Sequence, residues 1–481
     1  MSRSVHAVLD LVEFEQVDAA VAIQRWRDRE APHPGVERWV THAVTNVLSS
    51  EAGIEDLPTG LVPVSRWWAR QRPAKPDGSG TYEETVHGRR YENDYGVREI
   101  RLLRLLSVDQ READAREVAF AAGVVAGASR VLSNPWAGTE YRLGRFEAPK
   151  WIRVVEVGCD DGSARVLFSG TREDALERYN TVVAGSLSAV AVGGEYRPGD
   201  DCGGCALVDN CPAVPSLPGL LGVLSDATPR RTWSVTTGRN HLACAARAHF
   251  GRLFLPGDKA FEDTDATRRG RAVHHWIEQR HRVTPPRPCR ASDVPGPAEA
   301  WESGGWRVEG KQAGLGIQMI GDHSLTCPLR GLPTGTQVLP EESIVVFDPQ
   351  TNVVVVAKAD LLYRGIEGWT LRETKTQRYP GQGDMFDDYP QLALATVLSA
   401  RGVRAVGEVK LRVELERLTG AGPVLTEVDT SDPAVLARAE KVLLELVGDW
   451  LTDREHPTNP GEACRDCPYT RWCPDARRGR P

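Results

Sequence analysis

The sequence predicts an α/β fold in which a mixed sheet is flanked by helices. In residues 342–451, apolar strand-like runs are followed by a helical pattern, another strand and a long helix. This order is typical of α/β cores. A length of 481 residues suggests about two to four domains. A hydrophobic fraction of 41% and a charged fraction of 26% are those of a globular chain.

The first half of the chain mixes helical spacing with strand-like alternation. Turn residues at 93–96 and 160–162 each divide two strand patterns. The expected elements, in order, are helices in 1–70, strands within 82–106, a helix over 113–132, strands over 151–157 and 164–168, and a helix over 172–192.

Residues 212–229 are rich in Pro, Gly and Ser, which is typical of a connection between domains. We therefore expect an N-terminal α/β domain at 1–212, a linker at 213–231 and a second domain at 232–478. In the second domain the expected elements are helices over 242–253 and 266–281, strands over 342–347, 353–362 and 369–373, a helix over 389–400, a strand over 406–415 and a helix over 433–451.

Composition excludes several classes of protein. No apolar run approaches the roughly 20 residues that span a bilayer, and the N-terminus lacks a signal-peptide core, so we expect a cytoplasmic protein without a membrane partner. The net charge of −7 provides no global basic field, so any contact with DNA must be local. Ten cysteines in such a chain are more typical of metal binding than of disulfides.

Two neighbouring strand patterns carry a candidate catalytic set. Asp360 follows the apolar run at 353–356, and Glu373 and Lys375 end the next run. Alternate residues of a strand share a face, so pairing of the two strands brings two carboxylates and an ammonium together. Carboxylates bind Mg²⁺ or Mn²⁺, which suits phosphodiester hydrolysis. An ordinary hairpin with surface charges is the alternative.

A cysteine pattern occurs twice, each time after a helical stretch. Both copies read PG(D/E)xCx2Cx5CP, and they contain Cys202, Cys205 and Cys211 in the first and Cys464, Cys467 and Cys473 in the second. Three thiolates need a fourth ligand to complete a tetrahedral zinc site or a four-cysteine cluster. For the second copy we expect Cys244, although a lone helical cysteine is usually a small buried residue. For the first copy Cys159 is the nearest candidate, and its role stays open.

These residues together resemble the PD-(D/E)XK nuclease superfamily over about 232–478. Asp360 lies in a G-x-x-D-like pattern with alanine for glycine, Glu373-Thr374-Lys375 matches (D/E)xK, and Gly270 precedes His274 as in G-x-x-x-H. Gln391 matches the start of a QxxxY motif whose tyrosine is replaced by Ala395. The cysteine frame is similar to the iron–sulfur branch that contains AddB-type recombination nucleases and CRISPR-associated adaptation nucleases.

The resemblance implies a restriction-endonuclease-like core and roles for individual residues. His274, Asp360 and Glu373 would bind Mg²⁺ or Mn²⁺, Lys375 would position the attacking water, and Gln391 would support it. Cys244, Cys464, Cys467 and Cys473 would hold a 4Fe–4S cluster, with zinc as the alternative. Glu341 and Glu342 are expected to be solvated charges at a strand edge, and Cys289 and Cys327 receive no ligand role.

The expected function is a metal-dependent DNA exonuclease in repair, recombination or phage defence. The chain has no Walker A pattern, so a helicase motor would come from a partner, which could be another repair or defence subunit. The alternative is a non-catalytic DNA-binding scaffold. The N-terminal half lacks an acid-x-Lys pattern at a strand end, and we expect a degenerate copy that kept the closing cysteine module.

Overall fold

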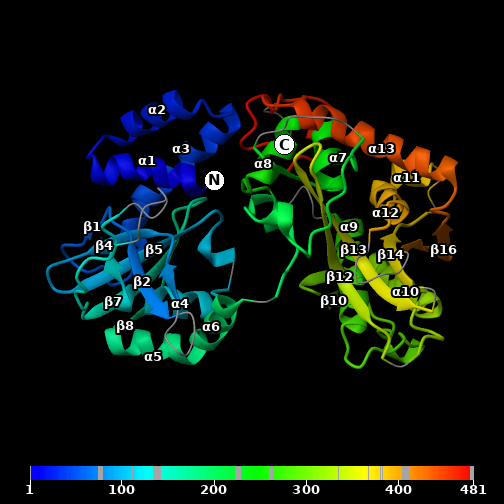
Figure 1. Cartoon of the computed structure of the whole chain (residues 1–481), viewed down its shortest axis with the longest axis horizontal. Coiled ribbons are helices and arrows are strands. Elements are labelled where there is room, and N and C mark those ends of the chain that lie inside the picture. The colour runs from blue at the N-terminus through cyan, green and yellow to red at the C-terminus, as the bar shows by residue number, and fades with distance from the viewer. Residues whose placement is uncertain are drawn as a thin grey trace. The chain divides into compact units, whose positions relative to one another are not determined.

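The computed structural model describes residues 2–73, 80–110, 112–133, 142–193, 195–222, 229–258, 264–333, 335–366, 368–379, 381, 383–403 and 411–476. The chain forms two compact units (Figure 1). The first comprises residues 1–195 with 250–257 and 471–474, and the second comprises 196–249, 258–470 and 475–481.

The first unit is built around a five-stranded sheet with the order β1-β4-β5-β7-β8. A smaller sheet has the order β3-β2-β6. The helices are α1 (Ser2–Phe14), α2 (Ala19–Glu30), α3 (Pro34–Ser49), α4 (Ala115–Gly127), α5 (Arg172–Val182) and α6 (Ala184–Val192). The strands are β1 (Val62–Pro63), β2 (Trp68–Pro73), β3 (Thr81–Thr85), β4 (Arg89–Glu92), β5 (Val97–Arg104), β6 (Ser129–Arg130), β7 (Trp151–Gly158) and β8 (Ala164–Thr171).

The second unit contains a larger sheet with the order β12-β13-β14-β15-β16, and β9 pairs with β13 outside this path. Its helices are α7 (Val235–Ala243), α8 (Ala245–Arg252, whose last residues belong to the first unit), α9 (Asp265–His281), α10 (Gly310–Thr326), α11 (Met385–Asp388), α12 (Pro390–Ala400) and α13 (Pro433–Thr452). Its strands are β9 (Arg231–Trp233), β10 (Ala300–Ser303), β11 (Trp306–Glu309), β12 (Val338–Asp348), β13 (Val353–Gly365), β14 (Gly368–Thr376), β15 (Leu411–Thr419) and β16 (Gly422–Val428).

The two main sheets have the same sequence of strand directions. In the second unit β12, β13 and β14 pair antiparallel, β14 and β15 pair parallel, and β16 returns antiparallel. In the first unit β1, β4 and β5 pair antiparallel, β5 and β7 pair parallel, and β8 returns antiparallel. In each unit a helix, α4 or α12, connects the parallel pair, which such a crossover requires. The two sheets thus share their strand directions, and the internal copy stays a prediction.

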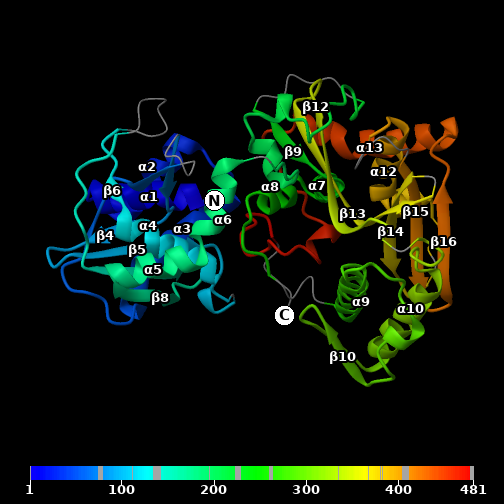
Figure 2. The same cartoon turned by 60° about the horizontal axis from the view of Figure 1, so that its bottom comes forward.

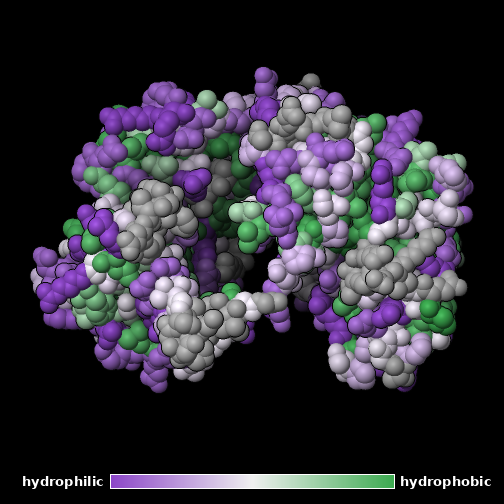
Figure 3. Space-filling view, viewed as in Figure 1, coloured by the Kyte–Doolittle hydropathy of each residue, from purple (hydrophilic) through white to green (hydrophobic). Residues whose placement is uncertain are grey.

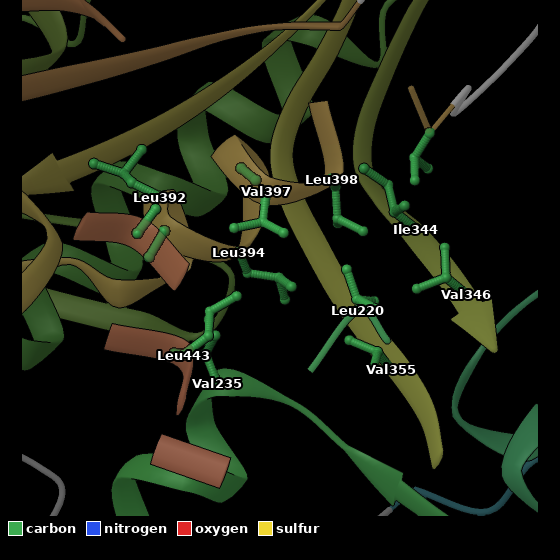
Figure 4. Packing of buried hydrophobic residues seen from close by; sticks show 14 of the residues in the cluster. Leu220, Val235, Ile344, Val346, Val355, Leu392, Leu394, Val397, Leu398 and Leu443 are labelled. Atoms are coloured by element: carbon green, nitrogen blue, oxygen red, sulfur yellow. The ribbon is translucent and has the colours of Figure 1, made fainter. Parts of the chain in front are cut away.

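Helices cover both faces of the sheet in the second unit. α12 contacts β13, β14 and β15 on one side, and α9 and α10 contact β12, β14 and β15 on the other. Figure 2 shows α12 and α13 on one side of these strands and α9 and α10 on the opposite side. Leu392 and Leu394 of α12 pack in one buried cluster with Val346 and Val355 of the sheet (Figure 4).

The predicted linker differs from the structure. Leu220 is 3% exposed and lies in the same cluster as Val346 and Val355 (Figure 4). The N–H groups of Gly219 and Leu221 donate to the buried Asp348 carboxylate at 3.0 and 3.1 Å. Residues 213–222 are therefore part of the second unit, because their leucines are buried and their backbone is hydrogen-bonded. The compact units divide after Glu195 rather than after residue 212. Residues 223–228 of the predicted linker lie outside the described residues.

Two helices of the second unit also differ from expectation. The helix expected over 242–253 is interrupted at Cys244, which ends α7 with an extended backbone before α8 begins. α10 was not expected at all. Its sequence contains four glycines, which lower helix propensity by about 1 kcal/mol each relative to alanine, so burial against α9 and the sheet stabilises it.

The surface agrees with the charged composition. Hydrophilic residues cover much of each unit in the face that Figure 3 shows. Among the described helices, none combines the length and the apolar character of a membrane span.

Candidate active site

The sheet of the second unit brings the predicted catalytic side chains together. Leu361 of β13 pairs with Arg372 of β14, so Asp360 lies at the next position on its strand, beside Glu373. The backbone N–H of Thr374 donates to Asp360 Oδ2 at 2.7 Å. Lys375 Nζ donates to Glu373 Oε1 at 2.5 Å. Antiparallel pairing and strand alternation produce this arrangement, as the sequence pattern predicts.

The electrostatics of the site are those of crowded carboxylates. Burial, and then the charge of Asp360, raise the pKa of Glu373 to about 7, and Lys375 acts in the opposite direction. Burial by itself lowers the pKa of Lys375, but the charges of Glu373 and Asp360 outweigh it and raise that pKa. Two carboxylates that repel each other in a partly buried site fit a divalent cation, which would relieve the repulsion.

α9 places His274 next to this set because a glycine lets the helix approach the strand. His274 Nδ1 lies 3.8 Å from Asp360 Oδ1. One turn earlier, a Cβ added at Gly270 would lie 2.9 Å from Thr376 Oγ1 of β14, closer than real Cβ contacts. The neighbouring His275 faces elsewhere and hydrogen-bonds Ser303 Oγ through Nδ1 at 2.8 Å. The G-x-x-x-H spacing therefore combines close packing with the position of the imidazole.

Gln391 begins α12, and its Oε1 atom is buried without a hydrogen-bond partner in the described part of the chain. An unpaired buried amide oxygen costs about 1–3 kcal/mol of folding stability, so a donor such as water is expected beside it. Tyr389, just before α12, donates its hydroxyl to Gln377 Oε1 at 2.6 Å. Sequence reasoning looked for a tyrosine four residues after Gln391 and did not consider Tyr389.

Glu341 is a further acidic residue that sequence reasoning left aside. It interrupts the pairing of β12 and β13 with a φ of 57°, between the pairs Pro340–Leu361 and Glu342–Ala359. Its charge contributes to the raised pKa of Glu373, and it forms a 2.5 Å ion pair with Lys358. The irregular pairing places Glu341 opposite Asp360, and only the register of the two strands in the fold shows this placement.

Behind the catalytic strand, buried charges hold β14 to β15. Thr374 lies between Glu373 and Lys375 and faces the other side of the sheet, where its hydroxyl donates to Glu416 Oε2 at 3.1 Å. Arg372 donates to Glu414 Oε2 at 2.7 Å. Glu416 is 0% exposed. This paired layer fixes the strand from which Glu373 and Lys375 project.

Three of the four cysteines predicted for the second module gather in the second unit. The charges of Cys244 and Cys464 act, after burial, to raise the pKa of Cys467. The N–H of Gly461 donates to Cys464 Sγ at 3.4 Å, a contact that suits a metal-bound thiolate. Cys473 belongs to a segment grouped with the first unit. The ligand set, and whether these thiols hold a metal or a cluster, stay predictions.

The first module has the same local geometry as the second. Gly199 N–H donates to Cys202 Sγ at 3.4 Å, as Gly461 does to Cys464. Cys202 and Cys211 pack against buried residues of the second unit, and Cys205 is exposed. Cys159 lies in the first unit, where burial raises the pKa of its thiol to about 12. Its role as a fourth ligand stays a prediction.

Comparison with known proteins gives one family. The family described as PD-(D/E)XK nuclease superfamily matches residues 232–474, about half of the chain. No curated protein matches the sequence. A solved structure titled "Crystal structure of SSO0001" is 16% identical, covers 53% of this chain and 89% of that chain, and has a TM-score of 0.25. A structural likeness of that size carries no argument about the fold.

Proposed function

Because the chain belongs to the PD-(D/E)XK nuclease superfamily, we propose that its second unit is a Mg²⁺- or Mn²⁺-dependent DNA nuclease that acts from DNA ends. The observation that supports this proposal best is the meeting of Asp360, Glu373 and Lys375 at the junction of β13 and β14. Nuclease activity is the general property of the superfamily. The preference for DNA ends and the place in repair, recombination or phage defence belong to the proposal alone.

Each side chain of the site has a defined role in this proposal. His274, Asp360 and Glu373 would hold the divalent ion. When bound, that ion polarises the phosphate and makes a bound water more acidic. Lys375 is held against Glu373 and carries its proton through the neutral range, so it can orient the attacking water and offset phosphate charge. Gln391 Oε1, which has no partner among the described residues, can accept a hydrogen bond from that water.

The first unit lacks an equivalent site at the corresponding strand. β5 takes the place of β14 in the shared topology, and its one acidic residue is Glu99, which is 0% exposed. Arg101 and Arg153 each donate to Glu99, at 2.7 and 2.9 Å. A carboxylate occupied by two guanidinium groups leaves no oxygen for a metal ion. We propose that this unit is a degenerate copy that binds DNA or a partner subunit such as a helicase.

For the cysteines of the second module we propose a structural 4Fe–4S cluster held by Cys244, Cys464, Cys467 and Cys473. Its support is the sequence resemblance, together with the mutual electrostatic influence of Cys244, Cys464 and Cys467. A visible absorption spectrum of anaerobically purified protein distinguishes a coloured cluster from colourless zinc. Loss of iron in Cys467→Ser, with iron retained in Cys211→Ser, would assign the cluster to this module.

The test of the nuclease is cleavage of 5′- and 3′-labelled single- and double-stranded DNA by the full chain, with Mg²⁺ or Mn²⁺ and with neither. Lys375→Ala should abolish cleavage, and Lys441→Ala should not, because Lys441 is an exposed lysine of α13. Release of mononucleotides from labelled ends supports an exonuclease. Residual cleavage in Lys375→Ala would locate activity elsewhere in the chain. A folded wild-type chain that binds DNA without cleaving it would support the alternative, a non-catalytic scaffold.

A further inference from the structure

Four metal-ligating side chains meet in the second unit at a place that the proposed nuclease site does not use. His281 is the last residue of α9 and Cys289 follows it in a loop, while His323 and Cys327 end α10. One ligand atom from each residue lies within 4.8 Å of the others, and all four residues are buried. We call this set the His-Cys group.

The two sulfur–nitrogen distances of His281 fit a tetrahedral metal site. With Zn–S bonds of about 2.3 Å and Zn–N bonds of about 2.0–2.1 Å, a sulfur and a nitrogen of a tetrahedron lie about 3.6 Å apart. His281 Nε2 lies 3.7 Å from Cys289 Sγ and 3.6 Å from Cys327 Sγ. All four ligand atoms lie within 4.8 Å of one another, as the ligands of one ion do, and a disulfide would leave both imidazoles unexplained.

His323 supplies an independent indication of a ligand. Its Nδ1 donates to both oxygens of Glu416, at 3.0 and 2.9 Å, which orients the ring so that Nε2 is the atom available to a metal ion. The residue is 1% exposed, and among the described residues Nε2 makes no hydrogen bond of ordinary geometry, its polar neighbour in the His-Cys group being the Cys327 thiol. A buried nitrogen without a partner is costly, and a metal ion would satisfy it. A carboxylate behind a histidine ligand is the usual outer support of zinc sites.

The surroundings of the His-Cys group favour a bound cation over four uncharged side chains that hold no ion. The backbone N–H of Cys289 donates to Cys327 Sγ at 3.3 Å, which stabilises negative charge on that sulfur. α9 and α10 both end at the group, and the C-termini of helices attract positive charge. Two thiolates and two imidazoles are a ligand set that suits zinc.

We propose that His281, Cys289, His323 and Cys327 bind one structural zinc ion. The ion fastens the ends of α9 and α10 to each other, and through Glu416 it is connected to Thr374 of the catalytic strand. This proposal does not depend on the nuclease proposal, and it is separate from the two cysteine modules. Zinc binding would displace the protons of the two thiols and contribute to the folding free energy of the unit.

The test measures zinc and iron per chain in the full-length protein after dialysis. The wild type should retain one zinc that the Cys289→Ser/Cys327→Ser variant lacks, while the iron content stays equal. In Cys464→Ser/Cys467→Ser, which alters the other module, that zinc should remain. X-ray absorption at the zinc edge should show two sulfurs at about 2.3 Å and two nitrogens at about 2.0–2.1 Å.

If the double serine variant does not fold, a second measurement tests the proposal. Glu416→Gln leaves every ligand in place and should weaken zinc retention against a chelator by about 10- to 100-fold. Wild-type protein stripped of zinc and reloaded with Co²⁺ should show the visible absorption of a tetrahedral site with two thiolates. The proposal is overturned if Cys289→Ser/Cys327→Ser retains as much zinc as the wild type, if mass spectrometry finds these cysteines joined as a disulfide, or if a folded Glu416→Gln holds zinc as tightly as the wild type.

Discussion

Replacement of Gly270 by alanine tests how closely α9 must approach the catalytic strand. The added Cβ would lie 2.9 Å from Thr376 Oγ1, whereas ordinary contacts begin at 3.4 Å. The helix or the threonine must therefore move by about 0.5 Å. His274 lies one turn further along the same helix and would move with it, away from its place 3.8 Å from Asp360.

The magnitude follows from two opposing terms. Alanine in a helix interior is favoured over glycine by about 1 kcal/mol, whereas overpacking costs about 1–3 kcal/mol. The net change in the free energy of unfolding should lie between zero and about 2 kcal/mol of destabilisation. A misplacement of 1 Å near reacting groups costs about 100-fold in rate, so a shift of half that size should lower single-turnover cleavage by about tenfold.

The assay compares Gly270→Ala with Gly321→Ala of α10, where an added Cβ meets nothing within 4 Å. Gly321→Ala should stabilise the protein by about 1 kcal/mol without loss of cleavage. Adding Thr376→Ala to Gly270→Ala removes the contacted oxygen and should restore most of the activity. If Gly270→Ala cleaves DNA like the wild type and stabilises it as Gly321→Ala does, the close approach of α9 is not needed, and the reasoning fails.

Three further predictions concern other parts of the chain. Because the pKa of Glu373 is raised from 4.5 to about 7, the metal-free protein should lose stability as the pH rises through that range. Mg²⁺ binds the deprotonated form of Glu373. Calorimetry should therefore show an apparent Mg²⁺ affinity that increases about tenfold per pH unit up to about pH 7 and then levels off. A constant affinity from pH 5 to 7 would argue against the raised pKa. Leu220→Ala should cost about 2–5 kcal/mol of unfolding free energy in urea, whereas Leu207→Ala, at a 73% exposed position, should change it by less than about 0.5 kcal/mol; equal effects would mean that residues 213–222 are not core. Glu99→Gln should destabilise the first unit by about 3–5 kcal/mol, since it leaves two buried guanidinium groups short of a partner, and should leave the rate of DNA cleavage per folded molecule unchanged.

The two units illustrate how a shared topology can carry different chemistry. β14 presents Glu373 and Lys375, whereas the matching strand β5 uses its acidic residue in a buried ion pair with two arginines. The same sheet topology thus places two carboxylates beside a lysine in one unit, and a carboxylate paired with two arginines in the other. The two cysteine modules have the same N–H to Sγ contacts, and the first of them lies in the second unit.

Local patterns in the sequence were sufficient for the parts of the protein that depend on neighbouring residues. The strands from 353 to 376, the helix at 433–452 and the acid-x-Lys pair all follow from alternation and helical spacing within short windows. Glu373 and Lys375 share a face because strand geometry requires it. The repeated cysteine pattern likewise produces the same backbone turn twice.

Tertiary structure decided the features that depend on residues far apart in the chain. The segment rich in Pro, Gly and Ser has the local composition of a linker. In the fold, Leu220 and Leu221 are buried, because the backbone of the segment donates to Asp348 and these leucines pack against strands of the second unit. Glu341 joins the acidic group only through a pairing irregularity between two strands. The His-Cys group requires the ends of two helices to meet, one of which carries four glycines and was not expected from its sequence. The i, i+4 spacing of His323 and Cys327 was visible in the sequence, but burial, the support of Glu416 and the opposite pair of ligands exist only in the fold, because metal sites are assembled by packing rather than by neighbouring residues.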